Sequence, residues 1–153
     1  MTTLKTEIHL QCLKVLDDFM ASLNAYDAAG MDRAMHFPHV RIARGEVKVY
    51  AQAGSNPMDL FDKLKAEDRW SHSRWDQRDL VQFNDVKAHY AVSYTRYRDD
   101  GSVIGVYESL YILTRDEHGG RSVGGKYEPV SQCPLDEKSR IGLGKLGVTP
   151  DGQ

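Results

Sequence analysis

Histidine, aspartate and tyrosine side chains are the groups in this sequence best suited to acid–base chemistry without a cofactor. His72 and Asp76 lie on a strand predicted from His72 to Phe83, and their even spacing projects them to one face. Histidine changes charge near neutral pH and a carboxylate can orient it, so the pair is a candidate for catalysis. The alternative is a solvated row shared with Trp70 and Arg74, because residues so far apart on a strand do not touch.

Two further histidines, His36 and His39, bracket Phe37 and Pro38 at the predicted mouth between a helix and the first strand. An H-x-x-H spacing can hold a metal on a helix, but Pro38 ends the helix here and no acidic partner is near. We therefore predict no metal site. One histidine is expected to face a pocket, with His36 a catalytic candidate and His39 and Phe37 candidates for ligand binding.

Tyrosines gather on one face of two predicted long strands, Val86–Arg98 and Val103–Arg115. An unpartnered buried hydroxyl costs about 1–3 kcal/mol, so a dry core would more readily use Phe and Leu. The polar tips therefore indicate water or a polar ligand inside; alternatively, the hydroxyls bond to one another or to the backbone. Tyr111 is a candidate to polarise a carbonyl group. The remaining candidates for ligand binding are Tyr26, Trp70, Tyr90, Tyr94, Tyr107 and Ser109.

Helices precede these strands. An apolar stripe at helical spacing predicts a first helix, with members Ile8, Cys12, Val15, Leu16, Phe19, Met20 and Leu23. Asp27 is a plausible N-cap for a short helix through Met35, and Asn56 for a third helix with Pro57 in its first turn. A strand pair over residues 40–49 turns at Arg44-Gly45, and residues 121–127 predict a short last strand. Helices segregated from an antiparallel sheet predict an α+β fold.

Composition excludes several classes of protein. The 153 residues carry a formal net charge of −2 with mixed signs, which gives no footprint for nucleic acid or an anionic membrane surface. No apolar run approaches the ~20 residues of a membrane span, and the N-terminus lacks a signal-type stretch. The two cysteines suit a reducing compartment, so we expect a cytoplasmic protein. Without a glycine-rich phosphate loop or a cysteine cluster, no cofactor is predicted.

The order of elements and three stretches of sequence resemble the nuclear-transport-factor-2-like superfamily, and within it the SnoaL-like group. The stretches are residues 16–42 (LDDFMASLNAYDAAGMDRAMHFPHVRI), 69–76 (RWSHSRWD) and 87–116 (KAHYAVSYTRYRDDGSVIGVYESLYILTRD). The resemblance implies a cystatin-like roll, a cone-shaped, curved, antiparallel or mixed sheet wrapped around three N-terminal helices. It also implies a pocket in the cone and a homodimer formed through the outer sheet face. It implies no single activity.

Ketosteroid-isomerase chemistry, known in this superfamily, is not expected here. That chemistry uses a helix tyrosine, a strand aspartate and a further acid on a central strand. Alignment of the resembling stretches puts Phe19, Ala43 and Ser109 at these positions. All three chemical groups are therefore missing.

The outer sheet face and the C-terminal tail are the two parts of the chain that indicate how it could form a dimer. An apolar row of Ile104, Val106, Leu110 and Ile112, broken by Glu108, needs a cover, which a second copy or the C-terminal tail would supply. Residues 1–134 are expected to form one domain. Residues 135–153, rich in Gly, Lys and Ser, are expected to form a flexible or docked tail.

Three functions stay open from the sequence. The first is a cofactor-free acid–base enzyme of dehydratase, cyclase or isomerase type that uses a pocket histidine and tyrosines. The second is a non-catalytic domain that binds a small apolar or aromatic molecule. The third is a dimeric adaptor with a filled pocket.

Overall fold

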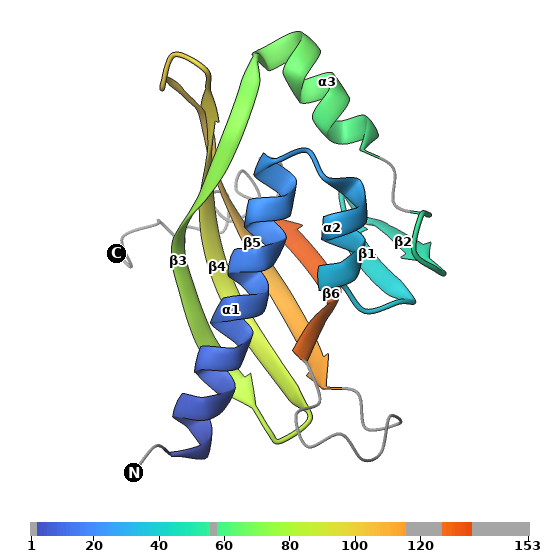
Figure 1. Ribbon diagram of the computed structural model, residues 1–153, viewed down its shortest axis with the longest axis vertical. Helices are drawn as coiled ribbons and strands as arrows, with labels where there is room; N and C mark the ends of the chain where they lie inside the picture. The colour runs from blue at the N-terminus through green and yellow to red at the C-terminus, as the bar shows by residue number, and fades with distance from the viewer. Residues whose placement is uncertain (1–2, 56–57, 116–126, 136–153) are drawn as a thin grey trace.

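The computed structural model describes residues 3–55, 58–115 and 127–135. Within them three helices and six strands follow in the order α1 (Leu4–Asn24), α2 (Ala28–Ala34), β1 (His39–Ala43), β2 (Glu46–Tyr50), α3 (Asp59–Asp68), β3 (Trp70–Phe83), β4 (Lys87–Arg98), β5 (Val103–Arg115) and β6 (Tyr127–Leu135). Helices α1 and α2 lie over one face of the sheet, and α3 sits beyond one end of α1 (Figure 1).

The strands form one mixed sheet in the order β2-β1-β6-β5-β4-β3. All neighbours are antiparallel except β1 and β6, which run parallel. The long strands β3, β4 and β5 curve around α1 (Figure 1). The α+β fold with a curved mixed sheet around three helices is thus confirmed.

Helix α1 forms because its apolar residues recur at helical spacing and its start is capped. The Thr3 side chain accepts a hydrogen bond from the Thr6 amide at 3.2 Å. All seven stripe residues predicted from the sequence are buried. Beyond α1, Tyr26 turns the chain with a left-handed φ of 56°, and the Asp27 side chain accepts from the Gly30 amide to cap α2.

The two halves of α1 serve different parts of the core. Ile8, Cys12, Val15 and Leu16 pack with Tyr90 and other strand residues in one tightly filled cluster. Phe19, Met20 and Leu23 belong to a second cluster, which includes residues of α2, α3 and β3. The second cluster surrounds the cavity described below, so the first half of α1 closes the core and the second half borders the site.

The β1–β2 hairpin turns its polar face inward. Its turn residues Arg44 and Gly45 have φ values of 55° and 76°, the left-handed pair typical of a tight hairpin turn. Because side chains alternate along each strand, Arg41 and Lys48 share one face and Ile42 and Val47 the other. The apolar face is outside, with Ile42 41% and Val47 65% exposed.

Three irregularities in β3 change which of its residues face inward. The register with β4 shifts between Trp70 and His72, between Trp75 and Gln77, and again before Gln82. Each bulge bends the strand and reverses the alternation that follows it. Trp70 is therefore buried in the core while His72 lies on the outer face, so the prediction that both share one row is wrong.

Three other local predictions also differ from the structure. Helix α3 has Met58 at its N-cap, without a side-chain cap, whereas Asn56 and Pro57 lie outside the described residues. The last strand is Tyr127–Leu135 rather than residues 121–127, of which 121–126 lie outside the described residues. Ile104, placed in the outer row by alternation, packs against the inner cluster because a bulge lies beside it.

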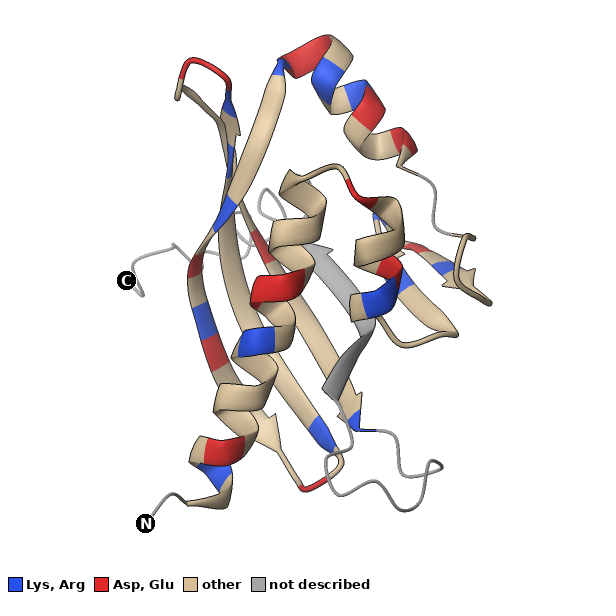
Figure 2. Ribbon diagram, viewed as in Figure 1, with Lys and Arg blue, Asp and Glu red and all other residues tan. Residues whose placement is uncertain are grey.

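Charge is mixed over the surface elements. Acidic and basic residues alternate along α1, α3 and β3 (Figure 2). No helix of the described chain combines the length and apolarity needed to cross a membrane.

Candidate functional site

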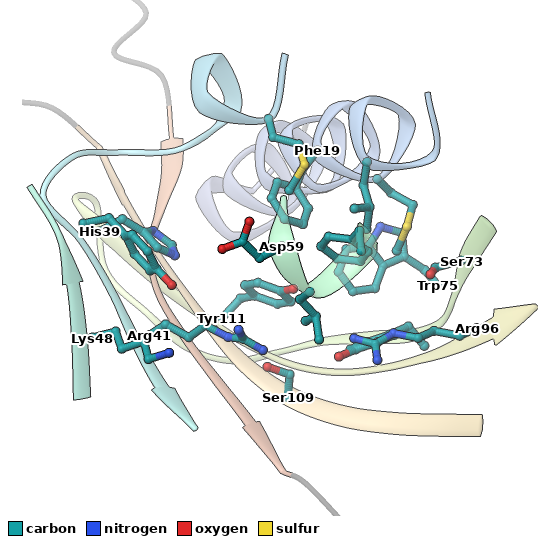
Figure 3. Close-up of a pocket in the computed structure, with 17 residues that line it drawn as sticks. Phe19, His39, Arg41, Lys48, Asp59, Ser73, Trp75, Arg96, Ser109 and Tyr111 are labelled. Carbon is teal, nitrogen blue, oxygen red and sulfur yellow. The ribbon is translucent and has the colours of Figure 1, made fainter. Parts of the chain in front are cut away.

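A cavity of about 180 Å³ lies between the second half of α1, the first turn of α3 and the concave face of the sheet. Its side chains come from α1, α2 and α3 and from the strands β1, β2, β3, β4 and β5 (Figure 3). The apolar part of the lining consists of Phe19, Met20, Leu23, Met31, Leu60, Phe61 and Trp75. The cavity is smaller than the several hundred cubic ångströms typical of ligand sites.

Aromatic contacts fix one wall of the cavity. The Trp75 ring meets Tyr94 and Tyr111 edge-on, at centroid distances of 6.0 and 5.6 Å. Its indole Nε1 donates to the Leu16 carbonyl of α1 at 3.1 Å, which anchors the ring. Burial raises the pKa of both tyrosines, so both stay protonated near neutral pH and can donate hydrogen bonds.

Basic side chains form the polar part of the lining. Arg41 and Lys48 come from the β1–β2 hairpin, and Arg96 comes from β4. The guanidinium of Arg96 lies 4.4 Å from the ring centroid of Tyr107 and hydrogen-bonds to Tyr94. Asp59, at the start of α3, is the carboxylate among the described lining residues. In Figure 3 its side chain points into the cavity.

Two buried polar atoms near the cavity have no hydrogen-bond partner among the described residues. They are the Oγ of Ser109 and the Nε of Arg96, and both residues line the cavity. Ser109 is 6% exposed. Because buried polar atoms are almost always bonded, these two are available to a bound molecule or to water.

Among the described residues that line the cavity, His39 is the one histidine. It begins β1 and is 2% exposed. Its ring lies beside those of Phe37 and Tyr50, at centroid distances of 6.5 and 6.3 Å. The described lining therefore combines one imidazole, the protonated phenols of Tyr94 and Tyr111, the phenol of Tyr50 and two serine hydroxyls with apolar side chains.

The structure brings four of the sequence-predicted site residues to the cavity: His39, Tyr94, Ser109 and Tyr111. Tyr94, Ser109 and Tyr111 come from the two long strands whose polar side chains were expected inside, and His39 comes from the predicted mouth. Phe19, aligned to the isomerase tyrosine, also lines the cavity, which agrees with the alignment although the hydroxyl is missing.

His72 and Asp76 lie outside the cavity. The His72 ring stacks on Tyr97 with centroids 5.1 Å apart, and its Nδ1 lies 3.2 Å from the Ser71 hydroxyl. Asp76 sits at a bulge and accepts a hydrogen bond from Thr95 at 2.6 Å. The structure does not bring this pair to the cavity: Ser73 and Trp75 line it, so strand alternation turns His72 to the opposite face, and Asp76 lies at the bulge after Trp75.

The other predicted site residues pack around the cavity without lining it. Tyr90 is fully buried in the first cluster and bonds to His9 at 2.9 Å. Tyr107 stacks behind Tyr94 at 5.5 Å. Trp70, Tyr26 and Phe37 belong to the second cluster, where the Trp70 indole donates to Ser73. His36 is partly buried beside the mouth and does not reach the lining.

Several residues of the lining were not predicted as site residues. Arg41, Lys48 and Tyr50 went unrecognised because an alternating strand does not show which face is inside. Trp75 was not predicted because the bulge between Trp75 and Gln77 interrupts the alternation from which its face would be inferred. Arg96 was not predicted as a site residue, although its even spacing from Tyr90 and Tyr94 puts it on their face and could have indicated its position.

The described residues contain no cluster of three His, Cys, Asp or Glu side chains arranged to hold a metal ion. The polar groups available for chemistry in the described lining are imidazole, phenol, hydroxyl and guanidinium groups, together with the Lys48 amine and the Asp59 carboxylate.

Three helices over a curved mixed sheet, with a cavity between them, define this chain as an α+β pocket protein of the cystatin-like roll. Its sequence matches the family described as NTF2-like protein (DUF6841) over residues 11–125. Because the match spans more than half of the chain, the protein belongs to this family. The superfamily expected from the sequence is therefore confirmed. No curated protein matches the sequence.

Solved structures share the fold at low sequence identity. A protein from Catenulispora acidiphila in complex with S-DNPA is 9% identical, with a TM-score of 0.66 over 89% of this chain and 98% of its own. The protein Aln2 from a Streptomyces species is 13% identical, with a TM-score of 0.64 over 90% and 96%. A cystatin-like protein of unknown function from Nostoc punctiforme is 12% identical, with a TM-score of 0.65 over 91% and 97%.

Proposed function

We propose that this protein binds a compact small molecule with an aromatic or alicyclic ring in the cavity beneath α1. The observation that carries the proposal is a partly open cavity of about 180 Å³ with apolar and aromatic walls. An engineered apolar cavity of about 150 Å³ takes up benzene, so this one suits one or two rings. The similar fold from Catenulispora acidiphila is in complex with S-DNPA, which supports small-molecule binding by this fold.

The cavity favours this function over that of an adaptor with a filled cone. Trp75, Tyr94 and Tyr111 contact one another at one wall, yet they leave room beside them. Two features retained from the sequence complete the proposal. The apolar outer sheet face would pair with a second copy, and the scarcity of cysteine suits the cytoplasm.

Neutral bicyclic probes test the binding function. We expect 2-naphthamide to bind one-to-one in isothermal titration calorimetry. Leu60→Trp, which fills the cavity from α3, should weaken binding at least about tenfold, or 1.4 kcal/mol. Leu10→Trp is the matched control, because Leu10 is 58% exposed on α1, and should bind as the wild type does. Equal binding by wild type and Leu60→Trp would place the probe elsewhere and contradict the proposal.

An acid–base enzyme is the second candidate, and the buried His39 favours it. His39 shares the cavity with Tyr94 and Tyr111, whose raised pKa values keep them as donors. A neutral imidazole nitrogen could take the α-proton of a bound ketone while the electron pair moves to the carbonyl oxygen. A tyrosine hydroxyl would donate to the resulting enolate oxygen. The imidazolium then returns a proton to carbon.

Hydrogen–deuterium exchange measures this chemistry without knowledge of the natural substrate. In D₂O the wild type should accelerate exchange at C1 of 2-tetralone, followed by NMR. His39→Gln should reduce the acceleration about 10²-fold or more, the range of general-base catalysis. His72→Gln is the matched control, since His72 lies on the outer face. If His72→Gln lost the acceleration and His39→Gln kept it, the assignment of the base would be wrong.

A further inference from the structure

Arg41 and Lys48 occupy directly opposed positions on β1 and β2, and both line the cavity. Like charges directly opposed across a strand pair destabilise the pair. Neither residue takes part in an ion pair within the described part of the chain. Arg41 is half-buried and Lys48 is exposed, so the pair places two cations on the hairpin face that borders the cavity.

Arg96 brings a third cation from the opposite side of the cavity. Arg41 and Arg96 each lower the pKa of both Tyr94 and Tyr111 against the larger effect of burial. Two arginines on distant strands therefore act on the same two hydroxyl groups. In Figure 3 they extend toward the cavity from opposite sides, with Tyr111 and Ser109 between them in this view.

Ser109 adds a hydroxyl that lacks a partner on the wall between these arginines. Its Oγ is buried and unbonded among the described residues, as is the Nε of Arg96. A serine hydroxyl donates readily to an anionic oxygen, and hydrogen bonds to charged groups are stronger than those between neutral groups. The Arg96 Nε can only donate and the Ser109 hydroxyl can donate as well as accept, so an acceptor on the ligand can satisfy both.

The charge of the lining is opposite to that of the chain. Three cations, Arg41, Lys48 and Arg96, face one carboxylate, Asp59, among the described lining residues. The whole sequence carries a formal net charge of −2. Asp59 is exposed at the mouth and forms no ion pair with the three cations among the described residues.

We propose that the ligand is an organic acid, a compact ring that bears a carboxylate. The ring lies against Phe19 and Trp75, and the carboxylate lies between Arg41 and Arg96, where one oxygen accepts from Ser109. The inference rests on the proposed binding function and names the class of its ligand. Guanidinium groups match a carboxylate in shape as well as charge, which makes arginine suited to this role.

Two probes that differ only in charge test the class of ligand. Titration calorimetry compares 2-naphthoate with 2-naphthamide at pH 7.4 and low salt. We expect the wild-type protein to bind the acid at least tenfold more tightly than the amide. Arg96→Gln or Ser109→Ala should weaken binding of the acid about tenfold and leave that of the amide within threefold. Arg74→Gln, exposed on the outer face of β3, is the control and should change neither.

Arg96 also packs on Tyr107, so Arg96→Gln could unfold the site. Lys48→Gln supplies a variant with an exposed side chain, and it should reduce the preference for the acid severalfold. Equal affinity of the wild type for acid and amide overturns the inference while the binding function stands. If neither probe binds, the binding function itself fails and the inference fails with it.

Discussion

Replacement of Trp75 by alanine is expected to lower the free energy of unfolding by about 3–5 kcal/mol and to abolish binding of ring probes. The Trp75 ring contacts both Tyr94 and Tyr111 edge-on, and its indole donates to the carbonyl of Leu16. The change removes this link between β3 and α1 and leaves a void beside the cavity. Urea denaturation followed by circular dichroism measures the stability, and calorimetry measures the binding.

Two control variants separate the loss of the Trp75 ring from the loss of its hydrogen bond to Leu16 and from a general effect of mutation in β3. Trp75→Phe keeps a ring at the wall but loses the hydrogen bond to Leu16, so it should cost roughly 1–3 kcal/mol and retain some binding. Arg74→Ala changes the exposed neighbour on the same strand and should stay within about 0.5 kcal/mol of the wild type. A loss below about 1 kcal/mol for Trp75→Ala would mean that the ring does not hold the wall in place.

The features of the fold that follow local rules could be predicted from the sequence. The apolar stripe of α1 has helical period, and all of its predicted members are buried. The Asp27 cap of α2 and the Arg44-Gly45 turn depend on a few adjacent residues, so their local chemistry determines them. The strands β4 and β5 alternate regularly over most of their length, which is why Tyr94, Ser109 and Tyr111 were placed inward and line the cavity.

The inward face of β3 could not be derived from the sequence, partly because bulges interrupt its alternation. One extra residue in a strand exchanges inside for outside for every residue beyond it. Bulges form where a long strand must bend around a helix, which depends on tertiary packing rather than on local preference. Between two bulges of β3 the strand alternates regularly, with Ser73 and Trp75 lining the cavity and His72 on the opposite face; the period of two does not show which of these faces lies inside.

The cationic lining was missed for a different reason. In the β1–β2 hairpin, valine and isoleucine alternate with Arg41 and Lys48, and burial of apolar surface normally decides which face turns inward. Here the apolar face is exposed, with Val49 62% accessible, while the charged face borders the cavity. This inversion places the polar face where a ligand could meet it, which is typical of functional sites.

Cys12 is expected to react with iodoacetamide about 10³-fold more slowly in the native protein than in the unfolded chain at pH 8.5. Burial against Tyr90 and its neighbours raises the pKa of the Cys12 thiol from 9.0 to about 12, an effect that a hydrogen bond with Tyr90 only partly offsets. Each pKa unit reduces the reactive thiolate tenfold. The measurement uses a Cys133→Ser background, so that Cys12 is the single thiol, and mass spectrometry follows alkylation.

The same shift predicts how stability depends on pH. The folded pKa lies above the unfolded value, so the contribution of the thiol is complete below pH 9 and declines as pH rises toward 12. Cys12→Ala should lose less stability than the wild type over this alkaline range. Cys12 packs in the filled half of α1, away from the cavity, so its protection reports how firmly that half is held on the sheet. Native alkylation within tenfold of the unfolded rate would show that this half of α1 opens readily and does not close the core.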